Sequence, residues 1–120
     1  MKLDHTIVPC SDKIASAKFY AEILGFKESG SHYSFEVVNV DDTLKLLFST
    51  RKHISSNHYA FRASAKEYDT VLNRLIVRSL PYGNSPTDRT NELEYTRAEE
   101  KGFYFDDPDG HILEVMTERE

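Results

Sequence analysis

Two histidines and one glutamate have the types and positions that a bound metal ion would require. His5 lies six residues before Ser11, which precedes a helical pattern. His58 lies at the same distance from Ser64, which also precedes a helical pattern, so the two histidines occupy equivalent positions. Glu114 stands in an apolar strand pattern, where an unpaired buried charge would be costly. Imidazole and carboxylate groups suit a divalent first-row metal, and three such ligands leave positions open for water or substrate.

The residues alone leave a second interpretation of these three side chains open. A histidine on a strand is often a hydrogen-bonded polar residue rather than a metal ligand. Glu114 could also pair with an arginine such as Arg62 or Arg97. The remaining histidines lie in loops or follow a turn glycine, and we expect them to be solvated: His32, His53 and His111.

A basic side chain accompanies His58 on its face of the predicted strand. Because side chains alternate between the two faces of a strand, His58 shares its face with Ala60 and Arg62. The small Ala60 leaves space between the imidazole and the guanidinium. Arg62 would suit a carboxylate or phosphate on a substrate, whereas pairing with a nearby glutamate is the simpler interpretation.

The first half of the chain predicts one helix and four strands in the order βαβββ. A β-branched run closed by proline predicts a strand over residues 3–9. Apolar residues at three- and four-residue spacing predict a helix over residues 12–24, with Ser11 as its N-cap. Further strands are expected over residues 26–29, 33–39 and 43–49, with turns at 30–31 and 40–42.

The second half begins with the same pattern. A strand is expected over residues 57–63, and Ser64 with Glu67 forms a capping-box pattern at the start of a helix. The expected apolar face of this helix consists of Tyr68, Leu72, Leu75 and Ile76.

The end of the second half predicts a hairpin. A polar stretch over residues 82–101 has no role that its pattern indicates. The turn sequence at residues 107–110 then separates two strands, expected over residues 102–106 and 111–117. The second half therefore also contains the elements of a βαβββ module, with additional residues in the polar stretch.

An internal alignment indicates a duplicated α+β fold built from two βαβββ modules in one chain. The two histidines that precede the helices are 53 residues apart, whereas alignment of the closing turns gives an offset of 68 residues between the modules. The second alignment places Leu46 opposite Glu114 and Glu36 opposite Tyr104. Coincidence is the competing explanation for these matches.

Length, charge and cysteine content exclude several classes of protein. The 120 residues carry a net charge of −5 and suit one globular domain, with modules expected at about residues 1–52 and 53–120. The single cysteine, Cys10, excludes an internal disulfide and a thiolate zinc cluster, and the negative charge argues against nucleic acid as a partner. No apolar stretch approaches the about 20 residues that span a bilayer, and no signal-peptide core is present, so we expect a cytoplasmic protein without a membrane partner.

Three segments of the chain form a familiar set: LDHTIVPCSDKIASAKFYAEILGF, NHYAFRA and FYFDDPDGHILEV. Together they resemble the vicinal oxygen chelate superfamily, which includes glyoxalase I, fosfomycin thiol transferases, extradiol dioxygenases and bleomycin-resistance proteins. The resemblance extends over nearly the whole chain. It implies two βαβββ modules that form a cupped mixed sheet with helices on the convex side, and often a homodimer. It also implies that His5, His58 and Glu114 bind a divalent metal ion, which could be iron, manganese, nickel or zinc.

The sequence departs from individual families at two places. Glyoxalase I has a further glutamate ligand that acts as a proton-transfer base, and that position falls here on or next to the apolar Leu46. Glu36 is the nearest substitute, and we expect it to point into the cup as a base. Tyr104 matches a substrate-contacting tyrosine of fosfomycin thiol transferases, but the preceding stretch ELEYTRAEEKG departs from that family's phosphonate-binding pattern. Fosfomycin is therefore not the expected substrate.

These observations predict a metal-dependent enzyme that acts on a small oxygen-chelating substrate. The expected chemistry is that of a lyase or isomerase, through a metal-stabilised enolate or oxyanion. Arg62 and Tyr104 would face the substrate, and Glu36 would act as the base. The alternative is a metal-free protein of the bleomycin-resistance type that binds and sequesters a small molecule.

Overall fold

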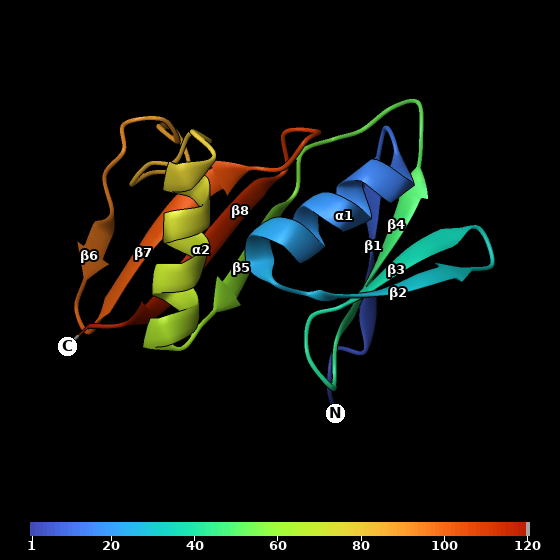
Figure 1. Ribbon diagram of the computed structural model, residues 1–120, viewed down its shortest axis with the longest axis horizontal. Coiled ribbons are helices and arrows are strands. Elements are labelled where there is room, and N and C mark those ends of the chain that lie inside the picture. Colours follow the sequence, from blue (N-terminus) through green and yellow to red (C-terminus); the bar gives the residue numbers. More distant parts are fainter. Residues whose placement is uncertain (120) are drawn as a thin grey trace. The chain divides into compact units, whose positions relative to one another are not determined.

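A computed structural model describes residues 1–119 (Figure 1). The chain forms two compact units, Met1–Ser55 and a second unit that begins at Ser56. Each unit contains one helix and one four-stranded mixed sheet, which confirms the predicted α+β class and the two βαβββ modules. Neither helix in the described residues has the length and apolar character needed to cross a membrane.

The first unit contains β1 (His5–Cys10), α1 (Lys13–Leu24), β2 (Lys27–His32), β3 (Phe35–Asn39) and β4 (Lys45–Thr50). The strand order in its sheet is β1-β4-β3-β2, with β1 parallel to β4 and the other neighbours antiparallel. Helix α1 covers one face of this sheet, where the rings of Tyr20 and Phe48 meet edge to face at 4.8 Å between centroids. The other face carries His5 and Ile7, because β1 residues alternate between buried and more exposed positions.

The cap of α1 differs from the prediction by one residue. The N-cap is Asp12 rather than Ser11, and its carboxylate accepts hydrogen bonds from the N–H groups of Ile14 and Ala15, each at 3.1 Å. An aspartate accepts these bonds through a charged oxygen, so it satisfies two free N–H groups of the first turn. Gly25 ends the helix with a φ of 78°, as its predicted role as a stop requires.

The turn between β2 and β3 also lies later than predicted. His32 pairs with Phe35, so the chain reverses at residues 33–34 rather than at 30–31. Gly30 has a φ of 77° and lies at a register shift inside β2. A glycine in this conformation makes a bulge in the strand, which is why the same residue type indicated a turn.

The second unit contains β5 (His58–Arg62), α2 (Ala65–Val77), β6 (Tyr95–Arg97), β7 (Glu100–Asp106) and β8 (Ile112–Glu118). The strand order is β5-β8-β7-β6, with β5 parallel to β8 and the other neighbours antiparallel. The hairpin β7-β8 confirms the predicted pair of strands around the turn. The edge strand β6 comes from the polar stretch that had no predicted role.

Helix α2 begins with the predicted capping box, since Ser64 and Glu67 exchange hydrogen bonds through their side chains and backbones. Its buried face differs from the prediction and consists of Tyr68, Val71 and Leu75, whereas Ile76 is 54% exposed. The contact therefore follows the i, i+3, i+7 stripe, and Ile76 lies beyond its edge. The Tyr68 ring packs on Phe103 of β7 at 4.9 Å between centroids, which places α2 on one face of its sheet.

His111 is buried, contrary to the prediction that it is solvated. Its side chain is fully covered, and Nδ1 accepts a hydrogen bond of 2.9 Å from the backbone N–H of Asn57. The imidazole thus satisfies a backbone group at the start of β5, which a turn-based interpretation does not reveal. His32 and His53 are exposed, as predicted.

The strand registers correct the internal alignment by one residue. Ile7 pairs with Leu47, and Ala60 pairs with Glu114; Ile7 and Ala60 each lie two residues after the histidine of their module. Leu47 rather than Leu46 is therefore the structural equivalent of Glu114. A slip of one residue exchanges the faces of a sheet, and Leu46 accordingly lies buried on the side of α1. Both residues are apolar, so the first module has no carboxylate at this position.

Candidate functional site

The sheet face of the second unit opposite α2 brings three of the predicted site residues together. His58 lies on β5, Glu114 on the central strand β8, and Tyr104 directly opposite Glu114 on β7. The rings of His58 and Tyr104 lie 5.8 Å apart between centroids. We call this surface the open face of the second sheet.

Glu114 is a buried carboxylate with a partner on each oxygen. Its residue is 5% exposed, and Oε1 lies 2.9 Å from Nε2 of His58, a ring that is itself partly exposed. Oε2 accepts a hydrogen bond of 2.6 Å from the hydroxyl of Tyr95, and Nη2 of Arg97 lies 3.9 Å from the same oxygen. These contacts supply the partners that a buried charge requires, as the sequence argument expected.

Tyr95 reaches Glu114 by crossing β7 at Gly102, which has no side chain. Tyr95 pairs with Gly102, and a Cβ atom on Gly102 would lie 2.3 Å from both Cζ and the hydroxyl oxygen of Tyr95. The missing side chain therefore creates the space in which the Tyr95 ring lies. Burial is the main cause that raises the pKa of Tyr95. The hydrogen bond to Glu114 and the negative charge of Glu114 raise this pKa further, so the hydroxyl stays protonated and can donate. Tyr95 was not among the predicted site residues, because it lies in the polar stretch 82–101, whose pattern indicates no role.

Tyr104 and Arg97 form a second polar pair on the open face. Nη2 of Arg97 donates a hydrogen bond of 2.7 Å to the hydroxyl oxygen of Tyr104, which is 3% exposed. Burial and the charge of Glu114 raise the pKa of Tyr104, while the guanidinium of Arg97 opposes this shift. Tyr104 is thus a protonated phenol whose orientation depends on Arg97.

Arg62 lies further along the same face and has a carboxylate partner. Alternation on β5 places Arg62 on the side of His58, and its guanidinium forms an ion pair with Glu100 of β7. This hydrogen bond raises the pKa of Arg62. The contact corresponds to the simpler of the two interpretations that the sequence allowed for this residue.

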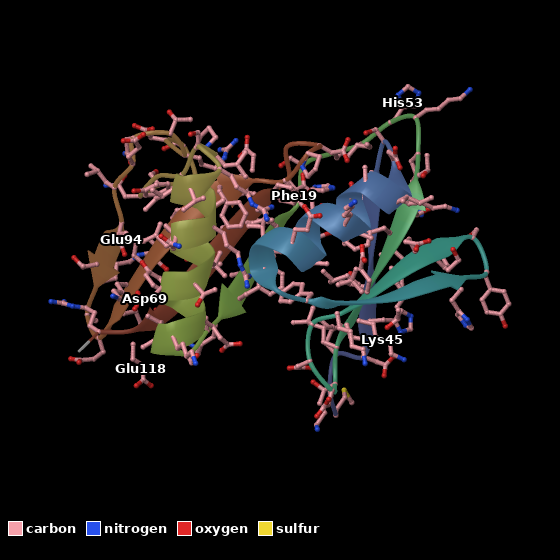
Figure 2. All side chains as sticks on the ribbon, viewed as in Figure 1. Phe19, Lys45, His53, Asp69, Glu94 and Glu118 are labelled. Atoms are coloured by element: carbon pink, nitrogen blue, oxygen red, sulfur yellow. The ribbon has the colours of Figure 1, made fainter. Side chains whose placement is uncertain are left out.

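Two predicted site residues, His5 and Glu36, belong to the first unit. His5 lies at the start of β1 opposite Lys45 of β4, which is labelled in Figure 2. Its Nδ1 lies 2.8 Å from a carboxylate oxygen of Asp4, and this hydrogen bond lowers the pKa of Asp4.

Glu36 does not share a sheet face with His5, contrary to the prediction. Glu36 pairs with Phe48, which is buried against α1, and cross-strand partners share a face. Its carboxylate accepts a hydrogen bond of 2.7 Å from the hydroxyl of Ser31. The predicted base therefore lies on the helix side of its sheet, because the true register differs by one residue from the alignment of the turns.

Comparison with known proteins assigns the family. The family model described as Glyoxalase/Bleomycin resistance protein/Dioxygenase superfamily matches residues 2–115. The chain belongs to this superfamily. No curated protein sequence matches it.

Solved structures support the membership in this superfamily and the shared fold. Two proteins named Oxidase ChaP-H2 and Oxidase ChaP-H1 are each 36% identical to this chain, with TM-scores of 0.92; the match covers 99% of this chain and 94% and 97% of theirs. A glyoxalase/dioxygenase from Nostoc punctiforme shares the fold at 19% identity, with a TM-score of 0.75 and coverage of 99% of this chain and 92% of that one.

Superfamily members commonly use divalent metals, and the pair formed by His58 and Glu114 has suitable donor chemistry. Two neighbouring ligand atoms in an octahedral site with bonds of about 2.1 Å lie about 3.0 Å apart. Nε2 of His58 and Oε1 of Glu114 are joined by a hydrogen bond of 2.9 Å, and this separation is also compatible with that spacing. No group of three metal-ligating side chains is assembled among residues 1–119, and His5 lies in the other unit. The second unit thus contributes two of the three predicted ligands.

Proposed function

We propose that this chain is a metal-dependent enzyme that carries out an oxidative reaction on a small oxygen-chelating substrate. The observation that carries the proposal is the pair of donor atoms on His58 and Glu114, 2.9 Å apart on the open face of the second sheet. Identity of 36% over nearly the full length to two proteins named as oxidases supports oxidative chemistry. Lyase or isomerase chemistry, which the sequence analysis favoured, remains a prediction that the same assay tests.

The proposed metal ligands are His5, His58 and Glu114. Support for His58 and Glu114 comes from their geometry, and support for His5 comes from its equivalent position in the repeat and from the superfamily resemblance. A bound divalent metal would supply a Lewis acid for substrate oxygens and, in an oxidative reaction, a redox centre. Three protein ligands leave room for a substrate that binds through two adjacent oxygens.

Tyr104 and Arg62 are the proposed substrate contacts from this chain. The Tyr104 hydroxyl lies opposite Glu114 and stays protonated, so it can donate a hydrogen bond to a substrate oxygen. Arg62 can orient an anionic group on the substrate if that group competes with Glu100 for the guanidinium. A small-molecule substrate and a homodimer complete the proposal, whereas Glu36 is no longer proposed as the base.

Metal analysis tests the proposal directly. Purified protein is reconstituted anaerobically with Fe²⁺, Mn²⁺, Ni²⁺ or Zn²⁺, desalted, and measured by mass spectrometry of the metal content. We expect one metal ion per chain in the wild type and loss of that ion in His58→Ala. The matched control is His53→Ala, which removes an exposed histidine from the first unit (Figure 2).

Turnover separates the reaction classes. The reconstituted protein is assayed for oxygen consumption with catechols, α-hydroxyketones and 1,2-diones, and for anaerobic isomerisation or elimination of the same compounds. Oxygen-dependent turnover that is lost in His58→Ala supports the proposal. A folded wild-type protein that retains no metal refutes it and favours the metal-free binding protein of the bleomycin-resistance type.

A further inference from the structure

We infer that Tyr95 is a positioning residue that holds Glu114 so that the carboxylate presents one oxygen, Oε1, toward a metal ion. This inference rests on the proposed function, because it concerns how a proposed ligand is oriented. It adds a residue from the edge strand β6, which contributes no ligand itself.

The two oxygens of Glu114 are held in different ways. Oε2 accepts the Tyr95 hydroxyl at 2.6 Å in a buried setting, whereas Oε1 faces Nε2 of His58 at 2.9 Å. A carboxylate can bind a metal ion through one oxygen or through both. Because the Tyr95 hydroxyl takes up one lone pair of Oε2 and fixes the orientation of the carboxylate, ligation through Oε1 alone is favoured.

Two contacts restrict the Tyr95 ring. The backbone of Gly102 lies beside it, since a Cβ atom there would come within 2.3 Å of Cζ and of the hydroxyl oxygen and within 2.4 Å of Cε2. The guanidinium carbon of Arg97 lies 4.1 Å from the ring centroid, a cation–π contact. Arg97 is held in turn by its hydrogen bond to Tyr104. The ring therefore cannot swing aside without disturbing either the sheet backbone or this pair.

A carboxylate that ligates through one oxygen leaves an additional coordination position open. A substrate that binds through two adjacent oxygens needs two such positions, so the arrangement suits the proposed substrate class. Groups that orient a ligand typically change metal affinity by about 10- to 100-fold when they are removed. Tyr95 should therefore affect metal binding although it is not a ligand.

The test measures Co²⁺ binding to the full-length Tyr95→Phe variant. Calorimetry gives the affinity, and the visible absorption spectrum reports the coordination of the bound ion. The matched control is Tyr68→Phe. Tyr68 also donates a hydrogen bond of 2.6 Å to a carboxylate in the second unit, but its partner is Glu94, which precedes β6 beside α2 (Figure 2). We expect Tyr95→Phe to weaken Co²⁺ binding about tenfold or more and to alter the spectrum, whereas Tyr68→Phe stays within about twofold of the wild type.

Circular dichroism checks that each variant is folded, and a second variant perturbs the same contact in another way. Gly102→Ala keeps every hydrogen-bonding group but displaces the Tyr95 ring, so in its folded form it should weaken Co²⁺ binding in the same direction. Wild-type affinity and an unchanged spectrum in folded Tyr95→Phe would overturn the inference while the proposed function stands. Absence of Co²⁺ binding by the wild type would instead refute the proposed function, and the inference with it.

Discussion

Replacement of Gly102 by alanine should destabilise the second unit through its effect on Tyr95. The new Cβ would lie 2.3 Å from the ring carbon Cζ and from the hydroxyl oxygen of Tyr95, whereas non-bonded carbon atoms in contact are about 3.5 Å or more apart. The ring must therefore move by about 1.2 Å, which is enough to break the 2.6 Å hydrogen bond to Glu114. Loss of a buried hydrogen bond to a charged group costs about 1.5–3 kcal/mol, and overpacking adds about 1–3 kcal/mol. We expect a total loss of about 3 kcal/mol or more in the free energy of unfolding.

Urea unfolding followed by circular dichroism measures this effect, with the same substitution in a Tyr95→Val background as the control. Valine is too short to reach the space over residue 102, so the clash should disappear. The cost of Gly102→Ala should then fall to about zero, or become a gain of up to about 1 kcal/mol because alanine restricts the unfolded chain more than glycine does. An equal cost in both backgrounds would refute the steric explanation.

Two further predictions concern α2 and its contacts. Ser64→Ala removes one half of the capping box and should lower the free energy of unfolding by about 1 kcal/mol. The control Ser55→Ala, at an exposed position, should change this free energy by less than about 0.5 kcal/mol. Urea unfolding at neutral pH measures both. Burial and the hydrogen bond to Glu94 raise the pKa of Tyr68 above its ordinary value near 10, so the folded state keeps the phenol neutral while the unfolded state ionises. Its stabilising contribution should be complete below about pH 10 and decline above it, and urea midpoints between pH 8 and 11 should fall less steeply in Tyr68→Phe; equal slopes would contradict the assignment.

The order of the elements could be predicted because it depends on local patterns. Capping by Ser64 and Glu67, the stop at Gly25 and the turn before β8 all involve residues close together in the sequence. The errors arose where two local signals competed. Ser11 and Asp12 are both good caps, and Gly30 suits either a turn or a bulge, so the residue types alone did not distinguish the two possibilities at either place.

The candidate site could be predicted only in part. The sequence indicated that Glu114 needs a partner, with Arg62 or Arg97 as an ion-pair partner and His58 as a fellow metal ligand. The structure places His58 and Arg97 beside Glu114 and pairs Arg62 with Glu100. The contact between Tyr95 and Glu114 joins strands that are not neighbours in the sheet, across the position of Gly102. No local pattern encodes a contact of this kind.

The sequence by itself determined the two-module α+β architecture, the superfamily resemblance and the residue types available as ligands, since these follow from periodicity, capping and composition. The tertiary structure alone decided which face each side chain occupies. Register is set by pairing between distant strands, and one residue of slip moves Glu36 to the helix side of its sheet and makes Leu47 the equivalent of Glu114. The same pairing brings Tyr95 over Gly102 and onto Glu114, which makes β6 part of the candidate site.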